Sequence, residues 1–141
     1  MTDNSESLPN LVLIRGLPGS GKSTIAQQMG EQGYIHIESD MYFLVKGKYV
    51  FNPLKTDDAH KWCQKEVRVA LKLGRKVVVS NTFVRLKEMQ PYLLMTSKVE
   101  IIHAKGCWAN IHGVSAAAIE RMAEQWEVLD SAQLKSRIVM R

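Results

Sequence analysis

The sequence predicts an α/β fold, a three-layer sandwich in which helices cover both faces of a short parallel sheet. Three observations predict it: short apolar runs alternate with helical patterns, the first run leads into a glycine-rich loop, and 141 residues suit one domain. Residues 11–141 are expected to form this single domain. Residues 1–10 are polar and acidic, and we expect them to be a disordered lead-in.

Four short apolar runs predict the strands of the sheet. Continuous apolar runs of this length are typical of parallel strands that are buried on both faces. The strands are expected at residues 11–14, 34–37, 76–80 and 99–103.

Helical patterns fill the segments between these runs. The first helix is expected from Lys22 to about Gln32, with Ile25 and Met29 turned inward, and Gly33 ends it. Further along the chain we expect a short helix at 41–45 and then a loop at 46–55.

A longer helix is expected to begin after Thr56, its predicted N-cap, and to end at Gly74. Its apolar residues at helical spacing are Ala59, Trp62, Cys63, Val69, Ala70 and Leu73. The last part of the chain is expected to hold a helix around 86–95 that contains the helix breaker Pro91, a loop at 104–114, and a helix from Ser115 to about Leu129. Residues 130–141 fit a helix and a strand equally.

The composition of the chain indicates which kinds of partner and which cellular location to expect. The net charge of +5 suits a partner that carries phosphates, although proteins without such partners often have it too. No apolar run approaches the roughly 18 residues of a membrane span, so no membrane partner is expected. Cys63 and Cys107 form neither a disulfide framework nor a metal-binding spacing, which favours a reducing, cytoplasmic location.

A phosphate-binding P-loop is the strongest motif in the chain. The motif is the glycine-rich octet at residues 16–23. Its glycines let the backbone approach a phosphate, and successive N–H groups form an anion nest at the start of the next helix. The lysine reaches the β- and γ-phosphates, and the serine hydroxyl is a Mg²⁺ ligand. An accidental glycine turn is the alternative, but a strand before the loop and a helix after it favour the P-loop. The predicted nucleotide-binding residues are Gly16, Leu17, Pro18, Gly19, Ser20, Gly21, Lys22, Ser23 and Thr24.

Residues beyond the loop suggest where an acceptor would bind, because ligands of open parallel sheets lie at the carboxyl ends of the strands. Asp40 follows the second strand, and its carboxylate can accept a proton from a hydroxyl or hold a Mg²⁺ water; alternatively, it caps a helix that starts at Met41. The third strand delivers Asn81 and no acid, so a metal would rely on Ser23 and Asp40. The basic and aromatic segment 46–51 suits stacking on a nucleobase, or simply covers an edge of the core.

Taken together, the chain from 11 to 127 resembles the P-loop polynucleotide kinase-like family of short, AAA-type kinases, typified by the kinase domain of phage 5′-hydroxyl polynucleotide kinase. The matching segments are 16–24, 37–40, 77–82 and 110–115, followed by Ile119, Arg121 and Met122. The resemblance extends to short kinase-like domains in animal proteins that bind a HECT-type ubiquitin ligase.

The resemblance implies ATP as donor, Mg²⁺ as cofactor, Asp40 as the carboxylate on the substrate side, and a lid over the phosphates formed by residues 110–121. The sequence departs from the family pattern where Phe43, Ala109 and His112 replace expected arginines. Arg121 is then the only arginine left near the lid. Since lid arginines stabilise the transferring phosphoryl group, this loss bears on turnover.

The predicted function is an ATP-dependent phosphotransferase, with Lys22, Asp40 and Arg121 as catalytic residues and Ser23 and Asp40 as metal ligands. The leading acceptor is the 5′-hydroxyl of a nucleotide or of a nucleic acid end. Two alternatives remain: a kinase for a small metabolite, and an ATP-binding interaction module with little transferase activity.

Overall fold

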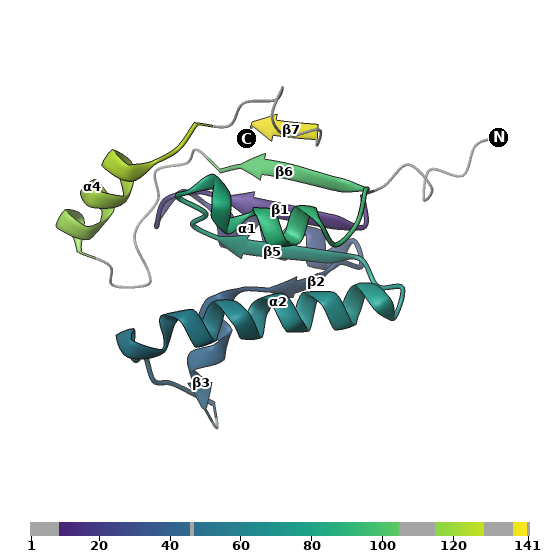
Figure 1. Ribbon diagram of the computed structural model, residues 1–141, viewed down its shortest axis with the longest axis horizontal. Coiled ribbons are helices and arrows are strands. Elements are labelled where there is room, and N and C mark those ends of the chain that lie inside the picture. The colour runs from purple at the N-terminus through teal and green to yellow at the C-terminus, as the bar shows by residue number, and fades with distance from the viewer. Residues whose placement is uncertain (1–8, 46, 105–114, 129–136, 141) are drawn as a thin grey trace.

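A five-stranded parallel sheet forms the centre of the protein. The computed structural model describes residues 9–45, 47–104, 115–128 and 137–140. The strand order is β2-β5-β1-β6-β7, and each neighbouring pair is parallel (Figure 1). The strands are β1 (Leu11–Arg15), β2 (Ile35–Ile37), β5 (Val77–Asn81), β6 (Val99–His103) and β7 (Arg137–Met140). The four predicted strands are confirmed, and β7 adds a fifth from the segment that fitted helix and strand equally.

Helices cover both faces of this sheet, which confirms the predicted three layers. On one face, α1 (Lys22–Glu31) packs against alternate residues of the strands, with Ala26 fully buried. On the other face, α2 (Thr56–Lys72) and α3 (Gln90–Leu93) cover the remaining strand residues. The side chains of β1 alternate between the two clusters: Leu11 and Leu13 face α2, whereas Val12 and Ile14 face α1.

The segment after β2 differs from the short helix and loop that the sequence predicts. A 3₁₀ helix, η2 (Ser39–Phe43), leads into a small antiparallel hairpin of β3 (Leu44–Val45) and β4 (Lys48–Tyr49). Aromatic contacts explain the difference, because the buried Phe43 ring lies 5.0 Å from Phe51 and 6.3 Å from Tyr49. Tertiary packing therefore overrides the local helical tendency of residues 41–45.

The start and the buried face of α2 are each offset from the prediction. A short 3₁₀ turn, η3 (Pro53–Lys55), runs directly into the helix, so Lys55 holds the N-cap position and Thr56 is the first helical residue. Val67 is fully buried, whereas Val69 is 47% exposed and Leu73 is 74% exposed. The apolar residues at 67, 69 and 73 allow two faces, and packing on the sheet selects the one that contains Val67.

The C-terminal helices are shorter than expected. The predicted helix around 86–95 divides into η4 (Leu86–Glu88) and α3, with Pro91 in the first turn of α3, where its missing N–H costs nothing. Ser115 caps α4 (Ala116–Gln125) as predicted, because its Oγ accepts a hydrogen bond from Ala118 N at 3.2 Å. The predicted loop falls almost wholly outside the described residues.

None of the helices in the described ranges combines the length and the apolar character that crossing a membrane requires.

Candidate functional site

The P-loop connects the carboxyl end of β1 to the start of α1. Gly19 and Gly21 have φ angles of 83° and 96°, a left-handed backbone that favours glycine. Gly21 is the N-cap of α1, and no side chain caps this end of the helix. The free N–H groups of the first turn therefore point into the loop, as phosphate binding requires.

Close packing at Gly16 holds the loop against the ends of two other strands. Gly16 N donates to Thr82 O at 3.3 Å, just beyond β5. A Cβ at Gly16 would meet Ser20 Oγ and would lie 3.0 Å from the carbonyl oxygen of Ala104, which follows β6. Ser20 Oγ is itself buried without a hydrogen-bond partner in the described part of the chain. Such an orphaned hydroxyl within a glycine loop fits a phosphate ligand.

Lys22 already lies within the curve of the loop. Its Nζ donates to Gly16 O at 2.8 Å and to Leu17 O at 3.0 Å. Burial lowers the pKa of the ammonium to about 8, and the nearby Glu38 carboxylate opposes this shift. The two carbonyl dipoles stabilise the Lys22 ammonium only in part. A bound triphosphate would supply a full negative charge beside it.

Glu38 is a site residue that the sequence reasoning passed over. Ile35 and Ile37 contact the cluster beneath α2, so the alternation of β2 puts His36 and Glu38 on the face of α1 and Lys22. The Nε2 atom of His36 lies 3.4 Å from Oε2 of Glu38. The signal in the sequence was this alternation along the strand, which makes Glu38, as well as Asp40, an acid at the carboxyl edge.

Asp40 is not a helix cap, so that alternative is wrong. Helix η2 begins at Ser39, its N-cap position is Glu38, and no side chain caps it. Asp40 Oδ1 instead accepts a hydrogen bond from the Tyr49 hydroxyl at 2.7 Å. Burial, together with this bond, raises the pKa of Tyr49 to about 12. The hairpin thus orients the carboxylate at the edge where β2 ends.

Asn81 connects the end of β5 to the Asp40 segment. Its Oδ1 accepts a hydrogen bond from Ser39 N at 3.0 Å, and Ser39 Oγ lies 3.0 Å from His60 Nδ1. A cavity of about 210 Å³ adjoins this network and is lined by residues that include His60, Gln64 and Asn81. Asn81 therefore positions η2. The same residue lines a cavity that a small group can enter.

The sequence left two roles open for the aromatic residues near the hairpin: covering an edge of the core and stacking on a nucleobase. Different residues suit each role. Phe43 is buried and covers the edge of the core. Tyr49 and Phe51 are 51% and 53% exposed, and their rings are nearly parallel, with an interplanar angle of 12° and 6.5 Å between centroids. An exposed pair of nearly parallel rings beside Asp40 can stack on a nucleobase. Lys48 is exposed on the same hairpin, whereas Lys46 lies outside the described residues.

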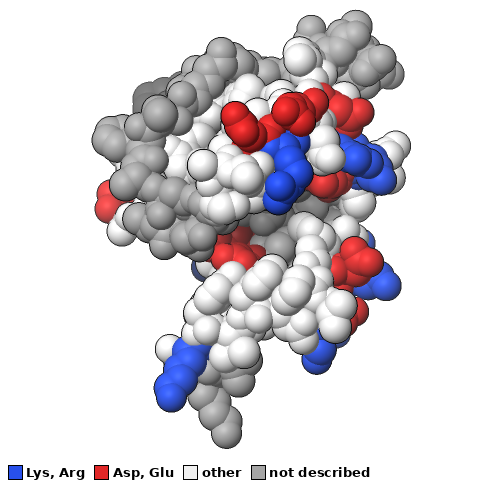
Figure 2. Space-filling view, turned by 90° about the vertical axis from the view of Figure 1, so that its left-hand side faces the viewer, with Lys and Arg blue, Asp and Glu red and all other residues white. Residues whose placement is uncertain are grey.

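Helix α4 carries Arg121 beyond the carboxyl ends of the strands (Figure 1). Figure 2 shows this side of the molecule, where the surface is hollowed below the charged region around α4. No residue of α4 is buried, and the exposed Arg121 forms no ion pair with Glu120 or Glu124. Ala109 and His112, where the family pattern has arginines, lie outside the described residues.

The C-terminal end of α4 is fixed to the start of the P-loop. Arg15 is fully buried and donates to Phe83 O at 2.8 Å, and its guanidinium carbon lies 3.8 Å from the centre of the Trp126 ring. The same ring stacks on His103, with 4.9 Å between centroids. Leu86 N donates to Glu127 Oε1 at 2.7 Å. Trp126 thus lies at the end of α4 and packs against the arginine that precedes Gly16.

Few side chains of the described segments could hold a metal directly. They contain no group of three or more His, Cys, Asp or Glu residues arranged to bind an ion. Ser23 lies in the first turn of α1, and Glu38 and Asp40 end the neighbouring β2 segment. This donor set fits an ion held mainly by one hydroxyl, phosphate oxygens and water, which is how Mg²⁺ commonly binds beside a nucleotide.

The described geometry agrees with comparisons to known proteins. A family model described as an AAA domain matches residues 11–109. The chain is 33% identical over 133 residues to human NEDD4-binding protein 2, covering 83% of this chain but only 8% of the length of that protein.

Two solved structures show the same fold at low sequence identity. A sugar kinase from Janibacter sp. superposes with a TM-score of 0.67 at 14% identity, covering 93% of this chain and 83% of that chain. A chain of the Pnkp1/Rnl/Hen1 complex superposes with a TM-score of 0.58 at 19% identity, covering 87% of this chain and 40% of that chain. The chain therefore has a P-loop kinase-like fold.

Proposed function

Since the chain belongs to the AAA domain family and has a P-loop kinase-like fold, we propose that it is a phosphotransferase that uses Mg-ATP. The proposed acceptor is the 5′-hydroxyl of a nucleotide or of a nucleic acid end. One observation carries the proposal: the loop that holds Lys22 and the segment that holds Asp40 meet at the same edge of the sheet. Gly16 N donates to Thr82 O and Ser39 N donates to the side-chain Oδ1 of Asn81, and these two bonds fix both segments against the end of β5.

On the donor side, the N–H groups at the start of α1 bind the phosphates, and Lys22 exchanges its bonds to the carbonyls of Gly16 and Leu17 for phosphate oxygens. Ser23 would hold Mg²⁺, with Glu38 or Asp40 placed to orient its water shell. The ion would neutralise charge that develops on the phosphates.

On the acceptor side, the Asp40 carboxylate takes the proton from the attacking hydroxyl. The Tyr49 hydroxyl donates to its Oδ1 and so orients the carboxylate for this role. The positive charge of Arg121 would stabilise the transferring phosphoryl group when α4 approaches the loop.

The exposed pair of Tyr49 and Phe51 supports a nucleobase near Asp40, and the resemblance in fold to a chain of the Pnkp1/Rnl/Hen1 complex is consistent with it. The small cavity at His60, Gln64 and Asn81 favours a second candidate, a kinase for a small hydroxylated metabolite. A third candidate, a nucleotide-binding module with little turnover, is favoured by Phe43, Ala109 and His112 at positions where the family has arginines.

Labelled ATP tests the three candidates in one experiment. Wild-type protein is incubated with γ-labelled ATP and Mg²⁺, and with 5′-hydroxyl DNA, 5′-hydroxyl RNA, nucleosides or a set of sugars. We expect label on the 5′ ends. Label on sugars alone would establish the second candidate, and ATP binding by calorimetry without any labelled product would establish the third.

A further inference from the structure

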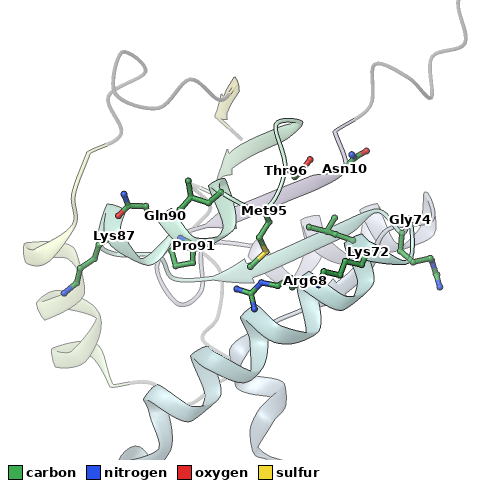
Figure 3. A pocket seen from close by; sticks show the side chains of 12 residues that line it. Asn10, Arg68, Lys72, Gly74, Lys87, Gln90, Pro91, Met95 and Thr96 are labelled. Carbon is green, nitrogen blue, oxygen red and sulfur yellow. The ribbon is translucent and has the colours of Figure 1, made fainter.

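A groove lies between α2 and α3, on the face of the sheet opposite α1 and away from the P-loop (Figure 3). Its volume is about 810 Å³. The C-terminal half of α2 forms one wall, and η4 and α3 form the other. The proposed kinase function uses none of its lining residues, so the groove calls for a separate explanation.

The charges that line the groove all have one sign. Its lining contains Arg68, Lys72, Arg75 and Lys87, and no acidic residue. Arg68 and Lys72 are four positions apart on α2, so they lie on one face of the helix. All four side chains are exposed, and within the described ranges none has a carboxylate partner. The groove therefore attracts negative charge.

The floor and rim of the groove are aliphatic. Leu71, Pro91 and Met95 are half-buried in its lining, and Leu94 at its edge is 82% exposed. In Figure 3, Met95 extends from the α3 side toward Arg68 on α2. No aromatic ring lines the groove, so a single-stranded nucleic acid would find no surface on which to stack its bases. An occupant that covers Leu94 must bring apolar as well as negative groups.

We propose that this groove binds an acidic amphipathic helix of a partner protein. Leucine-type side chains of such a helix would cover Leu71, Leu94 and Met95, and its carboxylates would pair with Arg68 and Lys72. Recognition of this kind combines helix-in-groove packing with charge complementarity across the rim. Because the groove shares no residue with the P-loop, binding there leaves ATP affinity unchanged, and this interaction does not depend on the proposed function.

The test uses a fluorescently labelled 18-residue peptide of Glu, Leu and Ala whose Glu and Leu residues share one helical face. Its controls are a scrambled peptide of the same composition and a labelled 20-nucleotide oligothymidylate. Fluorescence anisotropy is measured on the wild-type chain at low and at physiological salt. We expect the amphipathic peptide to bind more tightly than the scrambled one.

Two groove variants and two matched controls locate the binding. The charge variant combines Arg68→Gln with Lys72→Gln, and its control combines Lys55→Gln with Lys61→Gln, exposed lysines outside the groove. The apolar variant is Leu94→Gln, and its control is Leu54→Gln at a leucine that is 92% exposed elsewhere. All four change exposed residues, and circular dichroism checks their folding.

We expect both groove variants to lose about tenfold or more in peptide affinity, and both controls to bind like the wild type. Equal binding of the scrambled peptide, or an unchanged affinity in Leu94→Gln, would reduce the interaction to general charge attraction and overturn the proposal. Tighter binding of the oligothymidylate that depends on Arg68 and Lys72 would overturn it in favour of a nucleic acid. Absence of peptide binding would also overturn it.

Discussion

The donor side and the acceptor side of the candidate site are built in different ways. The donor side comes from one continuous octet, Gly16 to Ser23, whose phosphate-binding geometry is set by its own glycines and by the start of α1. The acceptor side is assembled from the end of β2, a hairpin, α2 and the end of β5, joined by hydrogen bonds such as those from Tyr49 to Asp40 and from Ser39 to Asn81.

This difference determines how each side responds to change. A substitution in the octet removes a phosphate contact directly, so its effect is expected in ATP binding. A substitution on the acceptor side changes the orientation of a carboxylate or a lid charge, so its effect is expected in turnover. The predictions below are designed to separate these two effects.

The largest expected effect on binding is at Lys22. Changing Lys22 to Ala removes an ammonium that meets the β- and γ-phosphates, and truncation of one partner in such a charge pair costs about 2–5 kcal/mol. Calorimetry should show a large loss of affinity for ATP, a smaller loss for ADP and almost none for adenosine. Lys61→Ala, at an exposed lysine of α2, is the matched control. Equal losses for all three ligands would contradict the assignment of Lys22.

The next effect concerns Arg121. Changing Arg121 to Ala should reduce turnover by about a hundredfold or more, because the positive charge that stabilises the transferring phosphoryl group is lost. ATP affinity should change much less. Steady-state kinetics with the acceptor found in the labelling experiment checks this, and Arg85→Ala, at an exposed arginine before η4, serves as control. If turnover were normal, Arg121 would be a surface residue with no part in the transfer.

A smaller effect concerns proton uptake. Burial lowers the Lys22 pKa to about 8, so at pH 8.5 the free protein holds this side chain mostly uncharged. Phosphate oxygens favour the charged form, so ATP binding should raise this pKa and take up a proton at pH 8.5. At pH 7 the side chain is already charged, and uptake through Lys22 should be much smaller.

Calorimetry in buffers with different ionisation enthalpies measures this uptake. Lys22→Ala provides the control, since it should abolish the difference between the two pH values. Uptake that persists in this variant would assign the proton to another group.

Sequence reasoning succeeded where the determinants are local. The octet, the cap at Ser115 and the four continuous apolar runs each depend on neighbouring residues, and the structure confirms these elements. It was less successful where residues distant in the sequence determine a contact or a buried face. The hairpin partner of Asp40 is Tyr49, and the buried face of α2 depends on the sheet beneath Val67.

Strand β7 and Glu38 illustrate the same limit. Strand β7 forms because β6 offers a free edge, which residues 137–140 alone do not reveal. The sequence reasoning passed over Glu38, because its place beside Lys22 follows from which face of β2 meets α1. The roles of Lys22, Ser23, Asp40 and Arg121 remain predictions.

The measurement that tests the proposed function most directly is a comparison of ATP binding and phosphoryl transfer in Asp40→Asn. Asn keeps the size of the side chain and its hydrogen bond from Tyr49, but it removes the basic oxygen. We expect ATP affinity and thermal unfolding to match the wild type, while transfer falls by about 10²–10⁴, the contribution of a positioned general base. Transfer at the normal rate in a folded, ATP-binding Asp40→Asn protein would contradict the account, because Asp40 would then lie outside the chemistry.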